Sequence, residues 1–140
     1  MSEPVRVAFM CVQNAGRSQM STAFAERERA ERGLEGEVEI LTGGTHPAEH
    51  VHPEVVEIMD EIDFDLSDRV PKAISDAELS SCDYVATMGC STLELDADTD
   101  IRDWDLDDPD GQDLDAVREI RDDIEGRVKT LFDEIEAGIA

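Results

Sequence analysis

Residues 5–23 read VRVAFMCVQNAGRSQMSTA and decide the fold of this chain. The apolar run that ends at Cys11 predicts a β-strand, the next five residues form a short loop, and Arg17 begins a helix. Backbone N–H groups in such a tight turn converge on one point, and the N-terminus of the following helix adds positive potential there. The Asn-Ala-Gly at 14–16 is small or turn-prone and lets the backbone close around a ligand. The stretch therefore predicts a strand–loop–helix unit with an anion-binding loop.

The same loop carries a candidate nucleophile. Arg17 supplies a planar guanidinium that matches a tetrahedral oxyanion with two hydrogen bonds at a time. Cys11 lies on the rim, where positive potential favours the thiolate form. A packed core cysteine beside an exposed helix end would also fit these letters, but their position between a strand and a helix favours a site for phosphate or arsenate. The residues expected to surround the oxyanion are Val12, Gln13, Asn14, Ala15, Gly16, Arg17 and Ser18.

The composition fits one folded, acidic domain over residues 1–140. The chain is 40% hydrophobic, and 36 acidic residues against 12 basic ones give a formal net charge of −24. The acidic residues are spread between apolar positions, which predicts a solvated acidic shell of the kind expected in a halophile's cytoplasm and destabilised at low salt. Such a charge makes nucleic acid and anionic membranes poor partners.

No segment predicts export, membrane insertion or a metal centre. No apolar run approaches the length of a membrane span, and a signal peptide's basic and apolar regions are missing, so we expect a cytoplasmic protein. Three cysteines, Cys11, Cys82 and Cys90, are too few and too scattered for a disulfide framework. The three histidines at 46–52 share a proline-containing loop without a nearby cysteine, so no metal is expected there.

Apolar periodicity divides the chain into alternating strands and helices, which predicts an α/β fold with a doubly wound, four-stranded parallel sheet flanked by helices. Strands are expected at 5–10, 38–41, 83–88 and within 100–106, and helices at 18–30, 52–62, 76–81 and 114–135. Ligands of such sheets bind beyond the carboxyl ends of the strands.

This rule sorts the remaining cysteines. Cys11 and Cys90 follow the first and third strands and belong at the ligand-binding edge, whereas Cys82 precedes the third strand and is expected to be structural. Cys82 and Cys90 are separated by about 26 Å of extended chain, too far for a disulfide in the folded state. Cys90 is either a buried strand end or a second thiol able to reach Cys11.

A thiolate that attacks a tetrahedral oxyanion needs a proton donor for the departing oxygen. The segment after the fourth strand belongs at the same edge of the sheet and is rich in carboxyl groups. Its position does not choose among Asp103, Asp105, Asp107, Asp108 and Asp110.

Four blocks of sequence carry a family resemblance. They are VAFMCVQNAGRSQM (7–20), GGTHPAEHVHPEVV (43–56), DYVATMGC (83–90) and DWDLDDPDG (103–111). In this order they resemble the low-molecular-weight protein tyrosine phosphatase superfamily, most closely its arsenate reductase branch. The resemblance implies a four-stranded parallel sheet flanked by helices, and a monomer.

The resemblance also implies roles for individual residues. Cys11 matches the nucleophile, Arg17 the oxyanion clamp, and Ser18 the hydroxyl that hydrogen-bonds the thiolate. Asp108, directly before a proline, matches the general acid, and Asn14 matches the residue that braces the loop.

Two departures from the phosphatase pattern favour a small inorganic oxyanion. The loop reads Arg-Ser-Gln where tyrosine phosphatases usually have Arg-Ser-Pro, and Asp-Pro-Asp-Gly offers no aromatic ring to stack on a phenyl group. The first hypothesis is therefore thiol-dependent arsenate reduction with release of arsenite. The alternative is hydrolysis of phosphotyrosine or small phosphate esters through a Cys11-phosphate, and a third is oxyanion binding without turnover.

The reductant is expected to be external, with no tightly bound cofactor. Thioredoxin-coupled arsenate reductases carry a pair of cysteines after the third strand. Cys90 resembles the first of the pair, and residues 91–104 contain no second. The resemblance thus implies either a low-molecular-weight thiol or a Cys11–Cys90 disulfide that a thioredoxin- or glutaredoxin-type protein reduces.

Overall fold

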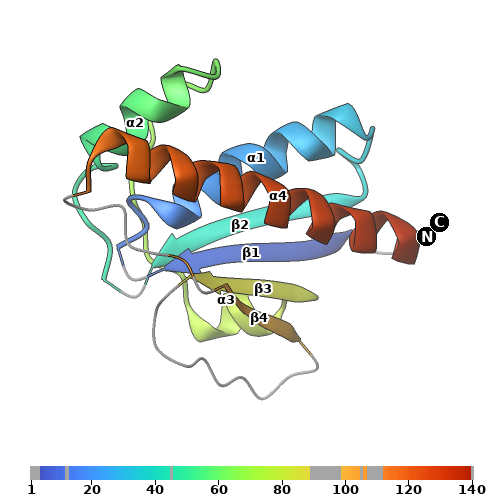
Figure 1. Cartoon of the computed structure of the whole chain (residues 1–140). Coiled ribbons are helices and arrows are strands. Elements are labelled where there is room, and N and C mark those ends of the chain that lie inside the picture. The colour runs from blue at the N-terminus through green and yellow to red at the C-terminus, as the bar shows by residue number, and fades with distance from the viewer. Residues whose placement is uncertain are drawn as a thin grey trace.

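Four parallel strands, in the order β2-β1-β3-β4, form the central sheet of the chain (Figure 1). The computed structural model describes residues 4–11, 13–44, 46–88, 99–104, 106 and 112–139. The strands are β1 (Val5–Cys11), β2 (Val38–Gly44), β3 (Tyr84–Met88) and β4 (Asp100–Trp104). The helices are α1 (Arg17–Glu31), α2 (Pro53–Asp60), α3 (Asp76–Ser80) and α4 (Leu114–Ile139). The prediction of a four-stranded parallel α/β sheet is confirmed.

The sheet buries both of its faces. β1 lies between β2 and β3, and its side chains alternate between two cores: Val7 and Phe9 belong to one, Ala8 and Met10 to the other. Figure 1 shows α1, α2 and α4 over the first face and α3 on the opposite face. The second core is the smaller of the two and includes Leu79 of α3. A parallel sheet needs this cover because both of its faces are apolar.

α4 lies along α1 and packs one apolar stripe against the first core. The stripe repeats at three- and four-residue intervals, so its members share one face of the helix. The buried residues of the stripe are Val117, Ile120, Ile124, Val128, Leu131 and Ile135. The sequence predicts this face, although the helix continues past the predicted end to Ile139.

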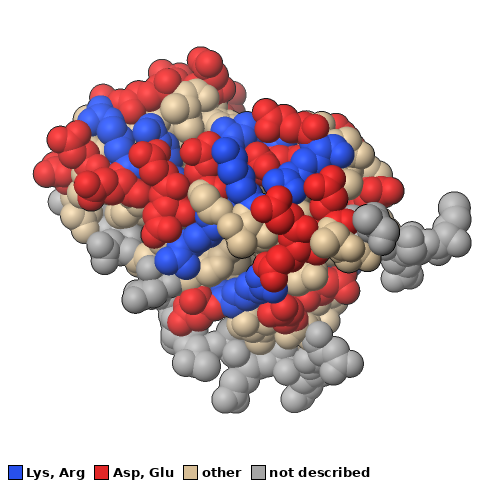
Figure 2. Space-filling model, turned by 45° about the vertical axis from the view of Figure 1, so that its right-hand side comes forward, with Lys and Arg blue, Asp and Glu red and all other residues tan. Residues whose placement is uncertain are grey.

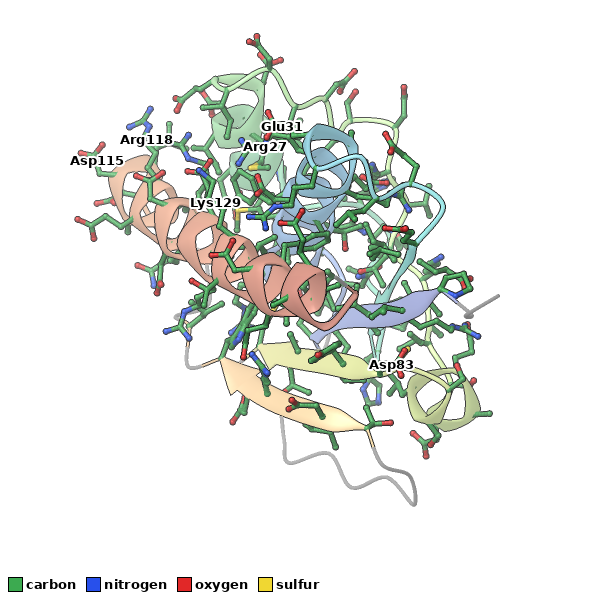
Figure 3. The ribbon with its side chains drawn as sticks, turned by 90° about the vertical axis from the view of Figure 1, so that its right-hand side faces the viewer. Arg27, Glu31, Asp83, Asp115, Arg118 and Lys129 are labelled. Atoms are coloured by element: carbon green, nitrogen blue, oxygen red, sulfur yellow. The ribbon has the colours of Figure 1, made fainter. Side chains whose placement is uncertain are left out.

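Basic side chains on the outer surface are interleaved with acidic ones (Figure 2). Figure 3 shows Arg27, Glu31 and Lys129 where α1 and α4 pack together. Arg27 pairs with Glu125 of α4 at 2.7 Å, and its guanidinium lies over the rings of Phe24 and Phe64. Arg27 therefore joins α1 to α4.

The ends of β2 and α2 also differ from the prediction. β2 continues past its predicted end at 41 through Gly43 and Gly44, which pair with Met10 and Cys11. A Cβ atom on Gly43 would lie 2.5 Å from the Cβ of Ile74, so this glycine permits close approach of a neighbouring segment. α2 ends at Asp60 rather than at 62, because the chain turns through a left-handed residue, Asp63, with φ 67°.

The parallel strands bring their carboxyl ends to one edge of the sheet. Cys11 ends β1 at this edge, and the loop to α1 follows it directly. Cys82 lies before β3, at the opposite end, and burial raises the pKa of its thiol. None of the helices in the described part of the chain is long and apolar enough to cross a membrane.

Replacing Gly43 by alanine should destabilise the fold by about 1–3 kcal/mol, because the new methyl group would overlap Ile74. Gly36→Ala is the matched control, since nothing lies within 4 Å of a Cβ at that position. Denaturant titration followed by circular dichroism in molar KCl measures the difference. Equal stability of the two variants would contradict the tight contact.

Candidate active site

The turn from β1 to α1 forms the candidate site. Cys11 is the last residue of β1 and is only 3% exposed. Residues 13–16 make the turn, and Arg17 is the first residue of α1. The strand is buried on both faces and the helix is anchored in the first core, so both ends of the turn are fixed.

The Cys11 sulfur lies within hydrogen-bonding distance of two groups in this turn. Its Sγ is 3.0 Å from the Ser18 Oγ and accepts a hydrogen bond from the Asn14 backbone N–H at 3.2 Å. Donors aimed at a sulfur stabilise its thiolate form, which is the nucleophilic form of cysteine.

A chain of side-chain hydrogen bonds orients the Ser18 hydroxyl. Thr42 of β2 donates from its Oγ1 to the Phe9 carbonyl at 3.1 Å. The Asn14 Nδ2 then donates to both Thr42 Oγ1 (2.9 Å) and Ser18 Oγ (2.8 Å). Because Ser18 Oγ accepts from Asn14, its own hydrogen is free to point at the Cys11 sulfur. The direction of each bond in the chain thus favours a donor at Sγ.

The carbonyls of the turn point outward, to other parts of the chain. Each carbonyl of residues 13–16 accepts a hydrogen bond from outside the turn, at 2.8–3.0 Å. In a planar trans peptide the N–H points away from the carbonyl, so the N–H groups of residues 14–17 lie on the opposite side. The donors are the Ala48 N–H for Gln13, the Gln19 side chain for Asn14, the His52 N–H for Ala15 and the Met20 N–H for Gly16.

Arg17 is 9% exposed and joins the turn to the segment after β4. Its Nη1 donates to the Leu106 carbonyl at 3.0 Å. A guanidinium has five N–H donors, so this bond fixes the side chain and leaves others for an anion. A backbone N–H beside the sulfur, a helix N-terminus and a guanidinium are groups that bind tetrahedral oxyanions in proteins, so this turn is a candidate for such a ligand.

Several predicted residues lie outside the described part of the chain. These are Val12, Cys90, Asp105, Asp107, Asp108 and Asp110. Among the candidate acids, Asp103 is described: it belongs to β4 and accepts a hydrogen bond from Thr87 at 3.0 Å. Asp103 is therefore hydrogen-bonded within the sheet. Asp105, two residues later, lies outside the described residues.

The histidines of the 46–52 segment have different positions. His46 and His50 are exposed, while His52 is partly buried and caps the start of α2. Among the described residues no group of three or more His, Cys, Asp or Glu side chains is arranged to hold a metal ion. This segment contributes through its backbone, which holds the carbonyls of Gln13 and Ala15.

Sequence reasoning missed Thr42 and Gln19 as parts of this site. The predicted second strand stops at 41, before Thr42, and Gln19 enters the prediction only as a departure from a phosphatase pattern. Two signals could have found them: Thr42 lies at the carboxyl end of the strand next to β1, and Gln19 is a polar residue on the first turn of a buried helix.

Comparisons with known proteins give a family match and several similar proteins. Residues 6–139 match the profile of the family described as low molecular weight phosphotyrosine protein phosphatase. A Halobacterium salinarum protein named putative arsenate reductase is 73% identical over 130 residues, 92% of each chain. The glutaredoxin arsenate reductase of Synechocystis is 31% identical over 93% of this chain and 98% of its own. The structure of a thioredoxin-dependent arsenate reductase from Corynebacterium glutamicum superposes with a TM-score of 0.80 at 34% identity, over 99% of this chain and 65% of that one.

Replacing Ser18 by alanine should slow alkylation of Cys11 at pH 7 by about tenfold, because the sulfur loses a donor at 3.0 Å. The rate is followed by mass spectrometry of the peptide that contains Cys11. Ser81→Ala is the control, since that hydroxyl donates to Glu78 beside α3. An unchanged rate in the Ser18 variant would show that the hydroxyl does not act on the sulfur.

Proposed function

We propose, since the chain belongs to the low molecular weight phosphotyrosine protein phosphatase family, that it is a thiol-dependent arsenate reductase. The observation that carries the proposal is the 73% identity, over 92% of both chains, to a protein named putative arsenate reductase. Cys11, the turn at residues 13–16 and the start of α1 supply what the first step needs: a cysteine sulfur beside backbone N–H groups and a guanidinium.

In the first step the Cys11 thiolate attacks the arsenic of bound arsenate. A sulfur–arsenic bond forms and one arsenic–oxygen bond breaks, while Arg17 and the N–H groups of the turn neutralise the remaining oxygens. The oxygen departs as a hydroxyl of the arsenate, takes one proton and leaves as water. We assign this proton to Asp108, whose position directly before a proline matches the general acid of the family.

The contact between Arg17 and Leu106 supports a proton donor from this segment of the chain. The Leu106 carbonyl is held at 3.0 Å by the same guanidinium that would clamp the oxyanion. Asp105, Asp107 and Asp108 all lie within two residues of Leu106 in the sequence, so the choice of Asp108 rests on the family motif.

In the second step a thiol attacks the Cys11 sulfur. A sulfur–sulfur bond forms, the sulfur–arsenic bond breaks, and its electron pair stays on arsenic, so As(V) leaves as arsenite. The two thiols are oxidised to a disulfide, which a further thiol must reduce. The attacking thiol is either an external one or Cys90 followed by an external reductant. The named relatives that depend on glutaredoxin or thioredoxin support a small thiol protein in this role.

Hydrolysis of phosphate esters is the second candidate, because the family profile is that of a phosphatase. The same turn would bind the phosphate, and water would release phosphate from a Cys11-phosphate. This chemistry needs no reductant, which separates it from arsenate reduction in one experiment.

Purified protein in molar KCl should release arsenite from arsenate when glutaredoxin, thioredoxin or a low-molecular-weight thiol is supplied, with little hydrolysis of p-nitrophenyl phosphate. Cys11→Ser should abolish the activity, because no other group replaces the nucleophile. Cys82→Ser is the control, since Cys82 lies at the far end of the sheet. Strong phosphate ester hydrolysis that survives Cys90→Ser, without arsenite release, would instead establish the phosphatase.

Replacing Asp108 by asparagine should lower kcat for arsenate by about 100-fold or more, because the departing oxygen loses its general acid. Asp103→Asn is the matched control, an acidic residue of neighbouring sequence that is bonded to Thr87. Steady-state rates of arsenite release measure both variants. A larger loss in the Asp103 variant would move the general acid to another carboxyl.

A further inference from the structure

Gln19 is a buried polar residue that the reaction described above does not use. It lies in the first turn of α1 and is 2% exposed. Its side chain folds back over the preceding turn: the Nε2 donates to the Asn14 carbonyl at 3.0 Å and to the Asn14 Oδ1 at 3.1 Å. Both hydrogens of the Gln19 amide are thus directed at one residue.

Asn14 is the residue whose conformation most needs support. Its φ of 52° lies in the left-handed region, which asparagine tolerates better than most side chains but not freely. In this conformation its N–H points at the Cys11 sulfur and its Nδ2 at Ser18 and Thr42. A rotation of Asn14 would therefore disturb both groups that contact the sulfur.

The Asn14 carbonyl differs from the other three of the turn in how it is held. The carbonyls of Gln13, Ala15 and Gly16 accept from backbone N–H groups, which a change of side chain at the donor leaves in place. The carbonyl of Asn14 accepts from a side chain. The orientation of the Asn14–Ala15 peptide, and with it the Ala15 N–H, therefore depends on the identity of residue 19.

Gln19 is also placed at a cost to stability. Its Oε1 is buried and has no hydrogen-bond partner among the described residues. A buried acceptor without a partner lowers the stability of the fold. A polar residue placed here despite such a cost points to a role in the site rather than in packing.

We propose that Gln19 is a positioning residue for the oxyanion loop. By holding the carbonyl and the Oδ1 of Asn14, it turns the Ala15 N–H toward the bound anion and keeps the Asn14 N–H on the Cys11 sulfur. This rests on the proposed function only for the identity of the anion as arsenate; the arrangement itself serves any tetrahedral oxyanion.

The experiment measures anion binding without turnover. Inorganic phosphate, and in parallel arsenate, protects Cys11 from iodoacetamide, and the half-protecting concentration is read by mass spectrometry of the Cys11 peptide. Gln19→Met should raise this concentration about tenfold, since one oriented donor is lost, and shift the alkylation pH profile to higher pH. Gln19→Glu should weaken protection further, because a carboxylate would face two Asn14 oxygens.

Ile124→Val is the control, a buried change in α4 that removes packing without touching the turn. Circular dichroism confirms folding of each variant. Weaker protection in Gln19→Met than in an Ile124→Val variant of equal or lower stability is a result that a packing role would not give. The proposal would be overturned if, in both Gln19 variants, the half-protecting concentration stayed within twofold of the unaltered protein and the alkylation pH profile did not move. Because phosphate protection needs no reduction step, the test stands even if no arsenite is formed.

Discussion

The left-handed conformation of Asn14 is the constraint on which the site depends. Each of its polar groups has a partner: the N–H bonds the Cys11 sulfur, the Nδ2 bonds two hydroxyls, and the oxygens accept from Gln19 and the Lys72 N–H. These partners come from β1, α1, β2 and the segment before α3. One residue thus links four parts of the chain, and each link can form only when the sheet and its covering helices are in place.

β2 shows how the sheet and the site are built together. Thr42 lies beside Phe9 in the strand pairing and donates to the Phe9 carbonyl, so the sheet register places its hydroxyl under Asn14. Gly43, which follows it, allows residues 72–74 to approach, and the Gly44 N–H donates to the Lys72 carbonyl at 2.9 Å. That approach brings the Lys72 N–H onto Asn14 Oδ1. Residues distant from Cys11 in sequence therefore hold the loop that surrounds it.

The fold could be predicted from the sequence because the apolar periodicities of strands and helices are local. The alternation of elements predicted the parallel sheet and placed Cys11 at its carboxyl edge and Cys82 at the other end. The motif predicted the loop, and the resemblance supplied the family. The contacts of Gln19 and Thr42 could not be predicted, because they depend on how α1 and β2 approach Asn14 in space. Cys90 and Asp108 lie outside the described residues, so their roles remain predictions from sequence.

The chain has a net charge of −24 and should repel an anion, so the proposed binding of an anion at the turn needs a physical explanation. Exposed charges are screened over about 3 Å at 1 M salt, so the acidic surface exerts little repulsion on an anion in molar KCl. In the proposed complex the N–H groups of the turn and the nearly buried Arg17 would contact the anion directly, and buried pairs are screened much less. Salt therefore removes the long-range repulsion while it leaves the short-range attraction. The other arginines reinforce this separation, because those such as Arg27 and Arg32 are paired with carboxylates between α1 and α4, away from the carboxyl edge of the sheet.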